Sequence, residues 1–235
     1  LNDDACENTK QIASDIMNSA TRLMSALTSM LDLAELQADK IQLKIANANI
    51  TEVCYELINL YKQKAKEKGL KLYLHSLDSN LSSKLDRKLL LKIMGQLLDN
   101  AIKFTHKGEV KIKVLPFSEG NKSFCKIEVS DTGIGIPEEY QSVVFEEFKQ
   151  ISEGLSRKYE GNGIGLTIAK GLTELMGGKI MLSSNIEGTT VSVMFNVSDE
   201  IVQRSVEDST EIRQSKVAGN YNILLVEDNY LNSEV

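Results

Sequence analysis

The stretch Gln96-Leu-Leu-Asp-Asn-Ala-Ile-Lys-Phe-Thr105 belongs to a segment with helical periodicity, residues 86–104. One side of the expected helix carries Leu90, Ile93, Leu97, Ala101 and Phe104. Gln96, Asn100 and Lys103 follow at steps of four and three, so they share the other side. The amide oxygen of Asn100 can ligate magnesium, and Lys103 can reach phosphate oxygens one turn later. Taken alone, this polar side would be an ordinary solvated helix face.

A second polar stretch, Asp131-Thr-Gly-Ile-Gly-Ile-Pro137, directly follows the strand expected at residues 125–129. A carboxylate fixed at the end of a strand can accept a hydrogen bond from an exocyclic amine such as that of adenine. The two glycines let the backbone approach a planar ring closely. Without further context, the same residues form a turn.

A third stretch, Gly161-Asn-Gly-Ile-Gly165, comes directly before a helix expected at residues 164–176. Glycines at this place free backbone N–H groups to hold phosphates, and the helix N-terminus adds a favourable dipole. A flexible junction between a loop and a helix would need the same residues, so this motif is weak by itself.

In this order the motifs resemble those of the Bergerat-fold ATPases, which include histidine kinases, type II topoisomerases, mismatch-repair ATPases and one chaperone family. Residues 96–105 resemble the N box of the histidine kinase branch, and residues 131–137 its G1 box. Phe145-Glu-Glu-Phe148 resembles the F box, residues 161–165 the G2 box, and Gly188-Thr189-Thr190 a later Gly/Thr box. A coincidence of five ordered motifs is far less probable than any one of them.

The resemblance implies a site for ATP and Mg²⁺. Asn100 would hold the magnesium, with a possible contribution from Gln96, and Asp131 would bind the adenine amine. Arg157, Lys158 and Tyr159 would belong to a mobile lid over the triphosphate, which shields ATP from water before transfer. Residues 138–160 have no strong apolar period apart from residues 143–145 and 148, so most of this range is predicted to be mobile without nucleotide and partly ordered with it. The complete set of nucleotide-binding residues implied in this way is Asn100, Lys103, Phe104, Asp131, Gly133, Gly135, Ile136, Arg157, Lys158, Tyr159, Gly161, Gly163, Ile164, Gly165, Leu166 and Thr190.

Three residues depart from the usual pattern of the histidine kinases: Gln96 for Asn, Glu160 for Gly and Asn162 for Thr. The hydrolysing relatives have a glutamate at the position of Gln96, which activates water. An amide cannot act as a base, so a kinase is favoured over a hydrolase. The alternatives are another Bergerat ATPase or serine kinase, and a degenerate kinase that serves as a nucleotide-binding or interaction module.

The expected fold is an α/β (α+β) two-layer sandwich, a mixed sheet with helices on one face. Besides the helices above, one is expected at residues 51–67. Strands are expected at about residues 70–74, 110–114, 125–129, 178–184 and 188–197. By the resemblance, residues 46–198 form the ATP-binding catalytic domain.

A long helix is expected ahead of this domain, over residues 3–38, because a heptad stripe runs through it without Gly or Pro. The stripe consists of Ala13, Ile16, Ala20, Leu23, Leu27, Met30 and Ala34. Such a stripe needs a partner helix or a second copy of itself, although it could also lie on its own domain. By the resemblance, residues 1–45 contain the second helix of a dimerisation and phosphotransfer domain, and residues 3–38 form a homodimer.

The C-terminal part reads as a polar linker, residues 199–220, followed by a buried strand at its end. Ile223-Leu-Leu-Val-Glu-Asp-Asn229 resembles the first strand and turn of a receiver domain, so residues 221–235 would be its truncated start. Glu227 and Asp228 would be its acidic pair. The implied parent is a hybrid sensor histidine kinase, whose partner is a receiver domain in cis or a response regulator in trans.

Only two histidines are present, His75 and His106, and neither matches the acceptor motif of the family. The chain is therefore expected to lack its own phosphoacceptor. The formal net charge of −6 argues weakly against nucleic acid as a direct partner. No apolar run reaches the roughly 18 residues of a membrane span, and three widely spaced cysteines fit reduced thiols, so a cytoplasmic location is expected. The parent could still be anchored in a membrane.

Overall fold

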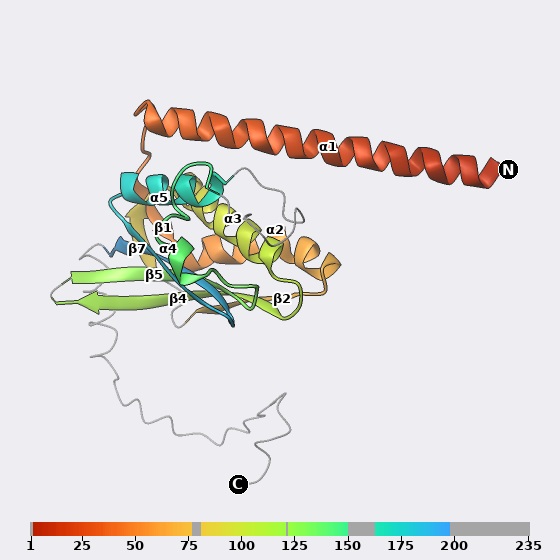
Figure 1. The fold of residues 1–235 in the computed structure, drawn as a ribbon. Coiled ribbons are helices and arrows are strands. Elements are labelled where there is room, and N and C mark those ends of the chain that lie inside the picture. Colours follow the sequence, from red (N-terminus) through yellow and green to blue (C-terminus); the bar gives the residue numbers. More distant parts are fainter. Residues whose placement is uncertain (1, 77–80, 121, 150–162, 198–235) are drawn as a thin grey trace, which may run out of the picture.

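Five strands form one mixed sheet, and three helices cover one of its faces (Figure 1). The computed structural model describes residues 2–76, 81–120, 122–149 and 163–197. The strands are β2 (Lys71–Ser76), β4 (Glu109–Glu119), β5 (Lys122–Asp131), β6 (Lys179–Asn185) and β7 (Gly188–Asn196), and their order is β2-β4-β5-β7-β6. Among the described strands of this sheet, only β2 and β4 pair in parallel. The predicted two-layer sandwich is confirmed.

The helices on the sheet are α2 (Ile50–Glu67), α3 (Arg87–Phe104) and α5 (Gly165–Leu175). Side-chain oxygens cap two of them: Asn49 accepts from Glu52 N at 3.1 Å, and Asp86 from Lys88 N at 2.9 Å. Alternate residues of the central strands face these helices. The core between the two layers includes Leu90, Ile93, Leu98, Val110, Ile112, Ile127, Val129, Ile168 and Val193. This packing fixes α3 in the middle of the molecule.

Two small features were not predicted. A two-stranded antiparallel sheet joins β1 (Ala46–Asn49) to β3 (Ser82–Leu85), and a single helical turn, α4, spans Glu138–Gln141. Both strands of the small sheet are four residues long, too short for an alternating pattern to stand out. Ser83 Oγ donates to the Asn196 carbonyl at 2.6 Å and so joins β3 to the end of β7.

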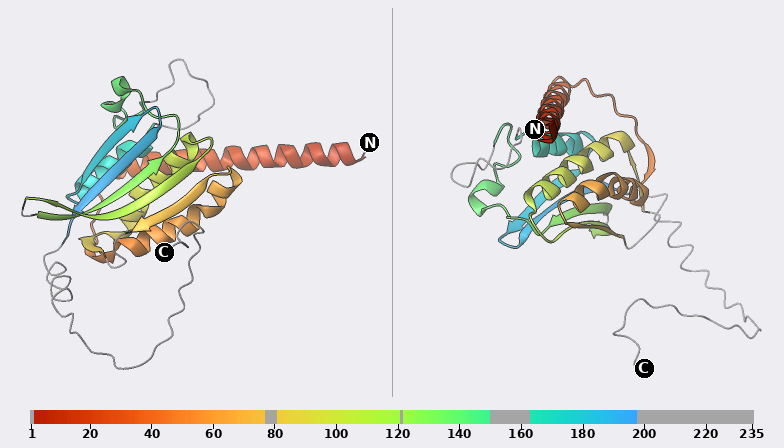
Figure 2. Two further views of the ribbon diagram at one scale, coloured as in Figure 1. Left: turned by 90° about the horizontal axis from the view of Figure 1, so that it is seen from below. Right: turned by 90° about the vertical axis from the view of Figure 1, so that its right-hand side faces the viewer.

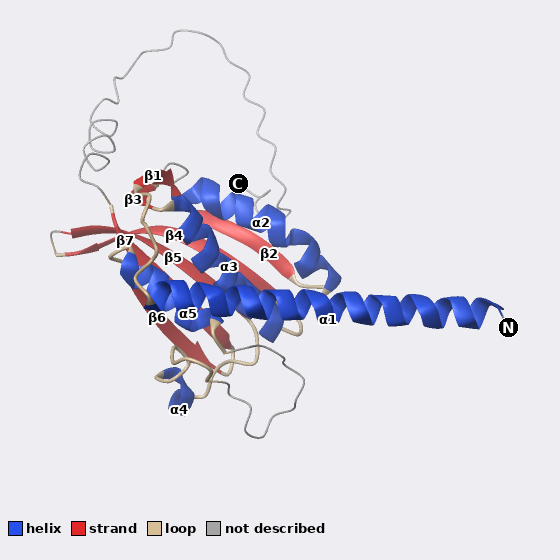
Figure 3. Ribbon diagram, turned by 90° about the horizontal axis from the view of Figure 1, so that it is seen from above, coloured by secondary structure: helices blue, strands red, loops and turns tan. Residues whose placement is uncertain are grey.

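The long helix α1 (Asn2–Gln37) is confirmed, and among the described elements it packs on α5 with its C-terminal end (Figures 2 and 3). Leu33 is buried there, and Leu36 packs so closely on α5 that a Cβ at Gly171 would lie 2.2 Å from its Cδ2 atom. Asp32 forms an ion pair with Lys92 of α3 at 2.5 Å. The stripe residues are exposed, so the alternative of a stripe lying on its own domain is wrong.

No helix within the described ranges is both long and apolar enough to cross a membrane. The predicted linker 199–220 and the segment 221–235 that resembles the start of a receiver domain lie outside the described residues. His75 lies in β2 and His106 in the turn after α3, as predicted.

Candidate active site

The polar side of α3 lies against the N-terminus of α5. A Cβ added to Gly165, the first residue of α5, would lie 2.7 Å from Gln96 Oε1 and 3.7 Å from Asn100 Nδ2. Both amides are partly exposed. Residues 69 positions apart therefore meet at one place, where amide oxygens stand beside a helix N-terminus. Glycine is the residue type that leaves this approach open.

The C-terminal end of α3 lies against the stretch 131–137. The Phe104 carbonyl accepts from Ile134 N at 3.4 Å, and a Cβ at Gly133 would lie 2.7 Å from that same carbonyl oxygen. Asp131 ends β5, and its Oδ1 accepts from Gly133 N at 2.8 Å. One helix thus contacts both glycine-containing stretches, which brings the three predicted motifs into one site.

Burial raises the pKa of Asp131 above its ordinary value of 3.8, against the opposing effect of hydrogen bonds from the backbone N–H groups of Gly133 and Thr189. A partly desolvated carboxylate is a poor feature for stability alone, because its charged form loses water. It is a strong acceptor for a ligand N–H donor, since a hydrogen bond to a charged group is stronger than one between neutral groups.

Ser184 of β6 anchors the stretch 131–137 from the other side. Its Oγ accepts from Ile136 N at 2.8 Å, donates to the Gly188 carbonyl at 3.0 Å, and lies 2.8 Å from Thr189 Oγ1. Gln141 of α4 donates to the Ile136 and Ser184 carbonyls, each at 2.9 Å. The sequence reasoning missed Ser184 and Gln141, since a serine in a strand and a glutamine after a turn carry no distinctive signal.

The conformation of this stretch depends on Gly135, whose φ is +68°. A Cβ there would lie 1.9 Å from the Asn185 carbonyl oxygen, which is backbone and cannot rotate away.

We expect Gly135→Ala to destabilise the chain more than Gly69→Ala does. Gly69 has the same φ of +68°, but a Cβ there meets nothing within 4 Å. Both variants should lose about 1–2 kcal/mol from the left-handed conformation, and Gly135→Ala roughly 1–3 kcal/mol more from the clash. Urea unfolding of the two variants measures this difference; equal losses would contradict the anchored geometry.

The other predicted site residues lie around the same place. Lys103 Nζ lies 4.7 Å from the centroid of the half-buried Phe104 ring. Thr190 of β7 donates from Oγ1 to Ser130 Oγ at 3.0 Å. Ile164 is buried and Leu166 half-buried at the start of α5.

Four predicted residues, Arg157, Lys158, Tyr159 and Gly161, lie outside the described residues, as do Glu160 and Asn162. The proposed increase of order in residues 138–160 on nucleotide binding stays a prediction. Among the residues that the structure covers, no cluster of three or more His, Cys, Asp or Glu side chains is arranged to hold a metal ion. A magnesium ion at this site would therefore depend on amide oxygens, water and the phosphates of a nucleotide.

Residues 85–199 match the family described as histidine kinase-, DNA gyrase B-, and HSP90-like ATPase. The autoinducer 2 sensor kinase/phosphatase LuxQ of Vibrio vulnificus is 33% identical over 234 residues, covering 97% of this chain and 27% of that protein. The circadian input-output histidine kinase CikA of Synechococcus elongatus is 33% identical over 194 residues, 80% of this chain and 25% of that protein. The chain thus spans about a quarter of the length of these relatives.

Among solved structures, full-length ShkA in complex with AMPPNP has a TM-score of 0.67 and 26% identity, covering 77% of this chain and 37% of that one. The histidine kinase AdeS of Acinetobacter baumannii has a TM-score of 0.62 and 18% identity, covering 79% of this chain and 84% of that one. At 18% identity, the likeness to AdeS concerns the fold alone. Residues 85–199 therefore belong to the histidine kinase-, DNA gyrase B-, and HSP90-like ATPase family, and the relatives that the chain matches over most of its own length are sensor histidine kinases.

Proposed function

We propose that this chain is the ATP-binding catalytic part of a hybrid sensor histidine kinase, which transfers the γ-phosphate of ATP to a protein histidine. The observation that carries the proposal is the contact of α3 with both glycine-containing stretches, through Gly165 at its middle and Gly133 at its end. The likeness to ShkA, whose structure contains the ATP analogue AMPPNP, supports the same ligand.

The donor set fits ATP with magnesium. Asn100, with Gln96 beside it, offers amide oxygens next to the N-terminus of α5, where phosphates gain from the helix dipole. Lys103 supplies a positive charge one turn from Asn100. Asp131 lies at the opposite end of the site and accepts a hydrogen bond from the adenine amine. The bound magnesium would neutralise charge on the phosphates during transfer.

The residues of this chain act by positioning and electrostatics. Backbone N–H groups at the start of α5 and the Lys103 ammonium hold the phosphates in place for attack by an imidazole nitrogen, with ADP as the leaving group. The side-chain amide of Gln96 on α3 cannot act as a base, so it would not activate water. Loss of ATP to hydrolysis is thereby limited.

The acceptor is a histidine other than His75 and His106. His75 is exposed on β2, with its side chain on the face of the sheet away from the helices. His106 lies in the turn after α3 and carries no acceptor motif. The proposed partners are a second copy of the chain, bound through α1, and a receiver domain in cis or a response regulator in trans.

Calorimetric titration of the 235-residue chain with AMPPNP tests the nucleotide site. We expect saturable binding that tightens when Mg²⁺ is added. Asn100→Ala should remove most of this tightening, roughly tenfold in Kd or about 1.4 kcal/mol, and change little when Mg²⁺ is chelated. Lys88→Ala, an exposed position in the first turn of the same helix, is the matched control.

Absence of AMPPNP binding by the unchanged chain would favour the degenerate module. Equal effects of Mg²⁺ on both variants would show that Asn100 is not a magnesium ligand. Steady phosphate release from ATP without any acceptor would favour a hydrolase instead.

A further inference from the structure

The face of the sheet opposite the helices, here termed the outer face, is basic although the chain as a whole is acidic. Strand alternation places five lysines on it: Lys71, Lys111, Lys113, Lys126 and Lys179. Two glutamates, Glu109 and Glu128, accompany them, and Glu119 lies at the hairpin tip. The outer face thus carries an excess of positive charge, although the chain has a net charge of −6.

Two of the lysines already have acidic partners. Lys126 Nζ lies 2.6 Å from Glu128 Oε1, and Lys111 Nζ lies 4.0 Å from Glu109 Oε1. Among the described residues, Lys71, Lys113 and Lys179 have no carboxylate within ion-pair distance. The outer face therefore presents uncompensated positive charge along β2, β4 and β6.

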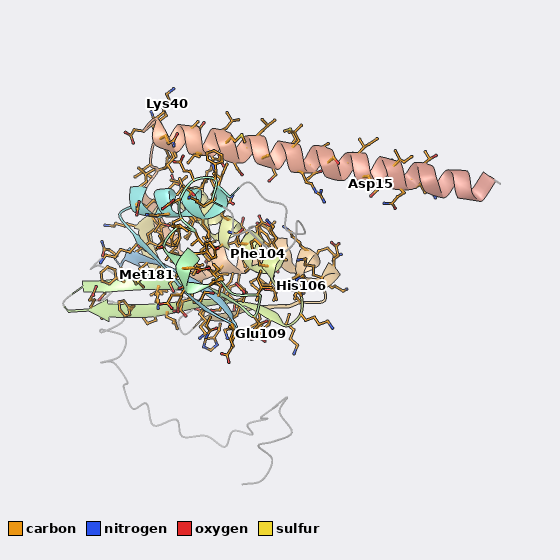
Figure 4. All side chains as sticks on the ribbon, viewed as in Figure 1. Asp15, Lys40, Phe104, His106, Glu109 and Met181 are labelled. Atoms are coloured by element: carbon orange, nitrogen blue, oxygen red, sulfur yellow. The ribbon has the colours of Figure 1, made fainter. Side chains whose placement is uncertain are left out.

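Apolar side chains lie between these lysines. Tyr73, Phe117 and Met181 are 37%, 39% and 47% exposed, because they point away from the helices (Met181 is labelled in Figure 4). The rings of Phe117 and Phe124 lie 6.2 Å apart. No helix covers this face in the described part of the molecule (Figure 1). An occupant that suits this face is a segment that contains both acidic and aliphatic residues.

We propose that residues 199–211 of the same chain, Asp-Glu-Ile-Val-Gln-Arg-Ser-Val-Glu-Asp-Ser-Thr-Glu, dock on the outer face. This segment has five carboxylates against a single arginine, and three of its residues are aliphatic. It begins three residues after β7 ends at Asn196, which pairs with Phe124. Its thirteen residues can extend to about 43 Å, which exceeds the roughly 33 Å that a ten-residue strand such as β5 spans.

Attachment to β7 makes weak contacts sufficient, because a short tether holds the segment at an effective concentration of about millimolar. The docked segment would also fix where residues 221–235, and whatever follows them, leave the catalytic unit. The outer face would thus orient the receiver domain, whose first strand residues 223–229 resemble, relative to the nucleotide site.

Zero-length carbodiimide cross-linking of the whole chain, followed by peptide mapping, tests this. Carboxylates of 199–211 should link to Lys113, Lys126 and Lys179 more often than to Lys62 and Lys88, which are exposed on α2 and α3. Raising NaCl to about 0.5 M should lower the yield roughly threefold or more. Mixing unlabelled with ¹⁵N-labelled chains shows whether each link lies within one chain.

Lys113→Glu with Lys179→Glu should also lower the yield of links to Lys71 and Lys126, which keep their amines. Adding Glu207→Lys with Glu211→Lys should restore linking between the segment and the outer face. Lys62→Glu with Lys88→Glu changes the charge equally and should leave the links to Lys113, Lys126 and Lys179 intact. Links spread evenly over all exposed lysines would overturn the proposal. So would links found mainly between labelled and unlabelled chains, since these would assign the face to a second copy.

Discussion

Replacing Leu23 and Leu27 by glutamate is expected to convert a dimer into a monomer at micromolar concentration. These side chains are 62% and 48% exposed on α1, and Ile16 and Met30 of the same stripe are 63% and 48% exposed. Each side chain of this size gains roughly 1.5–3 kcal/mol from complete burial. If the stripe stays in water, the free energy lost by not burying these four side chains is comparable to a typical domain stability of about 5–15 kcal/mol.

The contact between α1 and the catalytic unit does not compete with this dimer. Leu36 lies nine residues after Leu27, so at about 100° per residue it points to the opposite side of the helix. The stripe consequently remains free even where α1 is docked. Two copies can pair through it without releasing Leu33 or Leu36.

Analytical ultracentrifugation of the chain and its variants measures the association. Thr21→Glu with Ser25→Glu adds the same charge to an exposed part of α1 outside the stripe and should leave the dimer intact. A monomeric unchanged chain with a helical N-terminal segment would contradict the prediction, as would dissociation of both double variants alike.

Asp131→Ala is expected to weaken AMPPNP binding roughly 10–150-fold, because a hydrogen bond to a charged group contributes about 1.5–3 kcal/mol. It should also reduce the discrimination between adenine and guanine nucleotides. Competition by GTP against AMPPNP measures this second effect. Unchanged affinity and unchanged discrimination would remove Asp131 from the site.

Asp131→Asn separates the charge from the shape of the site, since its amide oxygen can still accept from Gly133 N. Burial raises the pKa of Asp131 in the folded state, so its protonated form stabilises the fold at pH values below the unfolded pKa. This stabilisation is lost as the carboxyl ionises, while pH rises through the folded pKa. Without nucleotide, the chain should therefore lose stability relative to Asp131→Asn as pH rises from about 3.5 to 7. Denaturant unfolding at both pH values tests this. A difference that does not change with pH would contradict it.

Much of the fold could be predicted because its elements repeat a regular pattern. The helix predicted at residues 86–104 repeats apolar residues with helical spacing, and the strands around residues 112 and 127 alternate apolar and polar residues. The structure confirms all three elements. The small sheet of β1 and β3 lacked such a pattern. Its residues are placed by tertiary contacts, such as the hydrogen bond of Ser83 to Asn196.

The site divides in the same way. The sequence predicted Asn100, Asp131 and Gly165 as site residues because their residue types are costly or unusual where they stand. Ser184 was not found, since its role depends on three neighbours that come together only in the folded sheet. Likewise, the sequence predicted an apolar stripe on α1 but not the second contact surface at Leu33 and Leu36, on another side of the helix.

The short joint between α1 and the catalytic unit also defines how a foreign helix would have to be grafted onto it. Asp32, Leu33, Leu36 and Gln37 make contacts at this joint, so a grafted helix must end in the same residues. The graft must also keep its heptad phase. Inserting one residue upstream of the joint would turn the stripe by about 100° around the axis of α1 and carry it forward by about 1.5 Å. In a chimeric receptor, that single residue would aim the two catalytic units of a pair in different directions, although neither had changed.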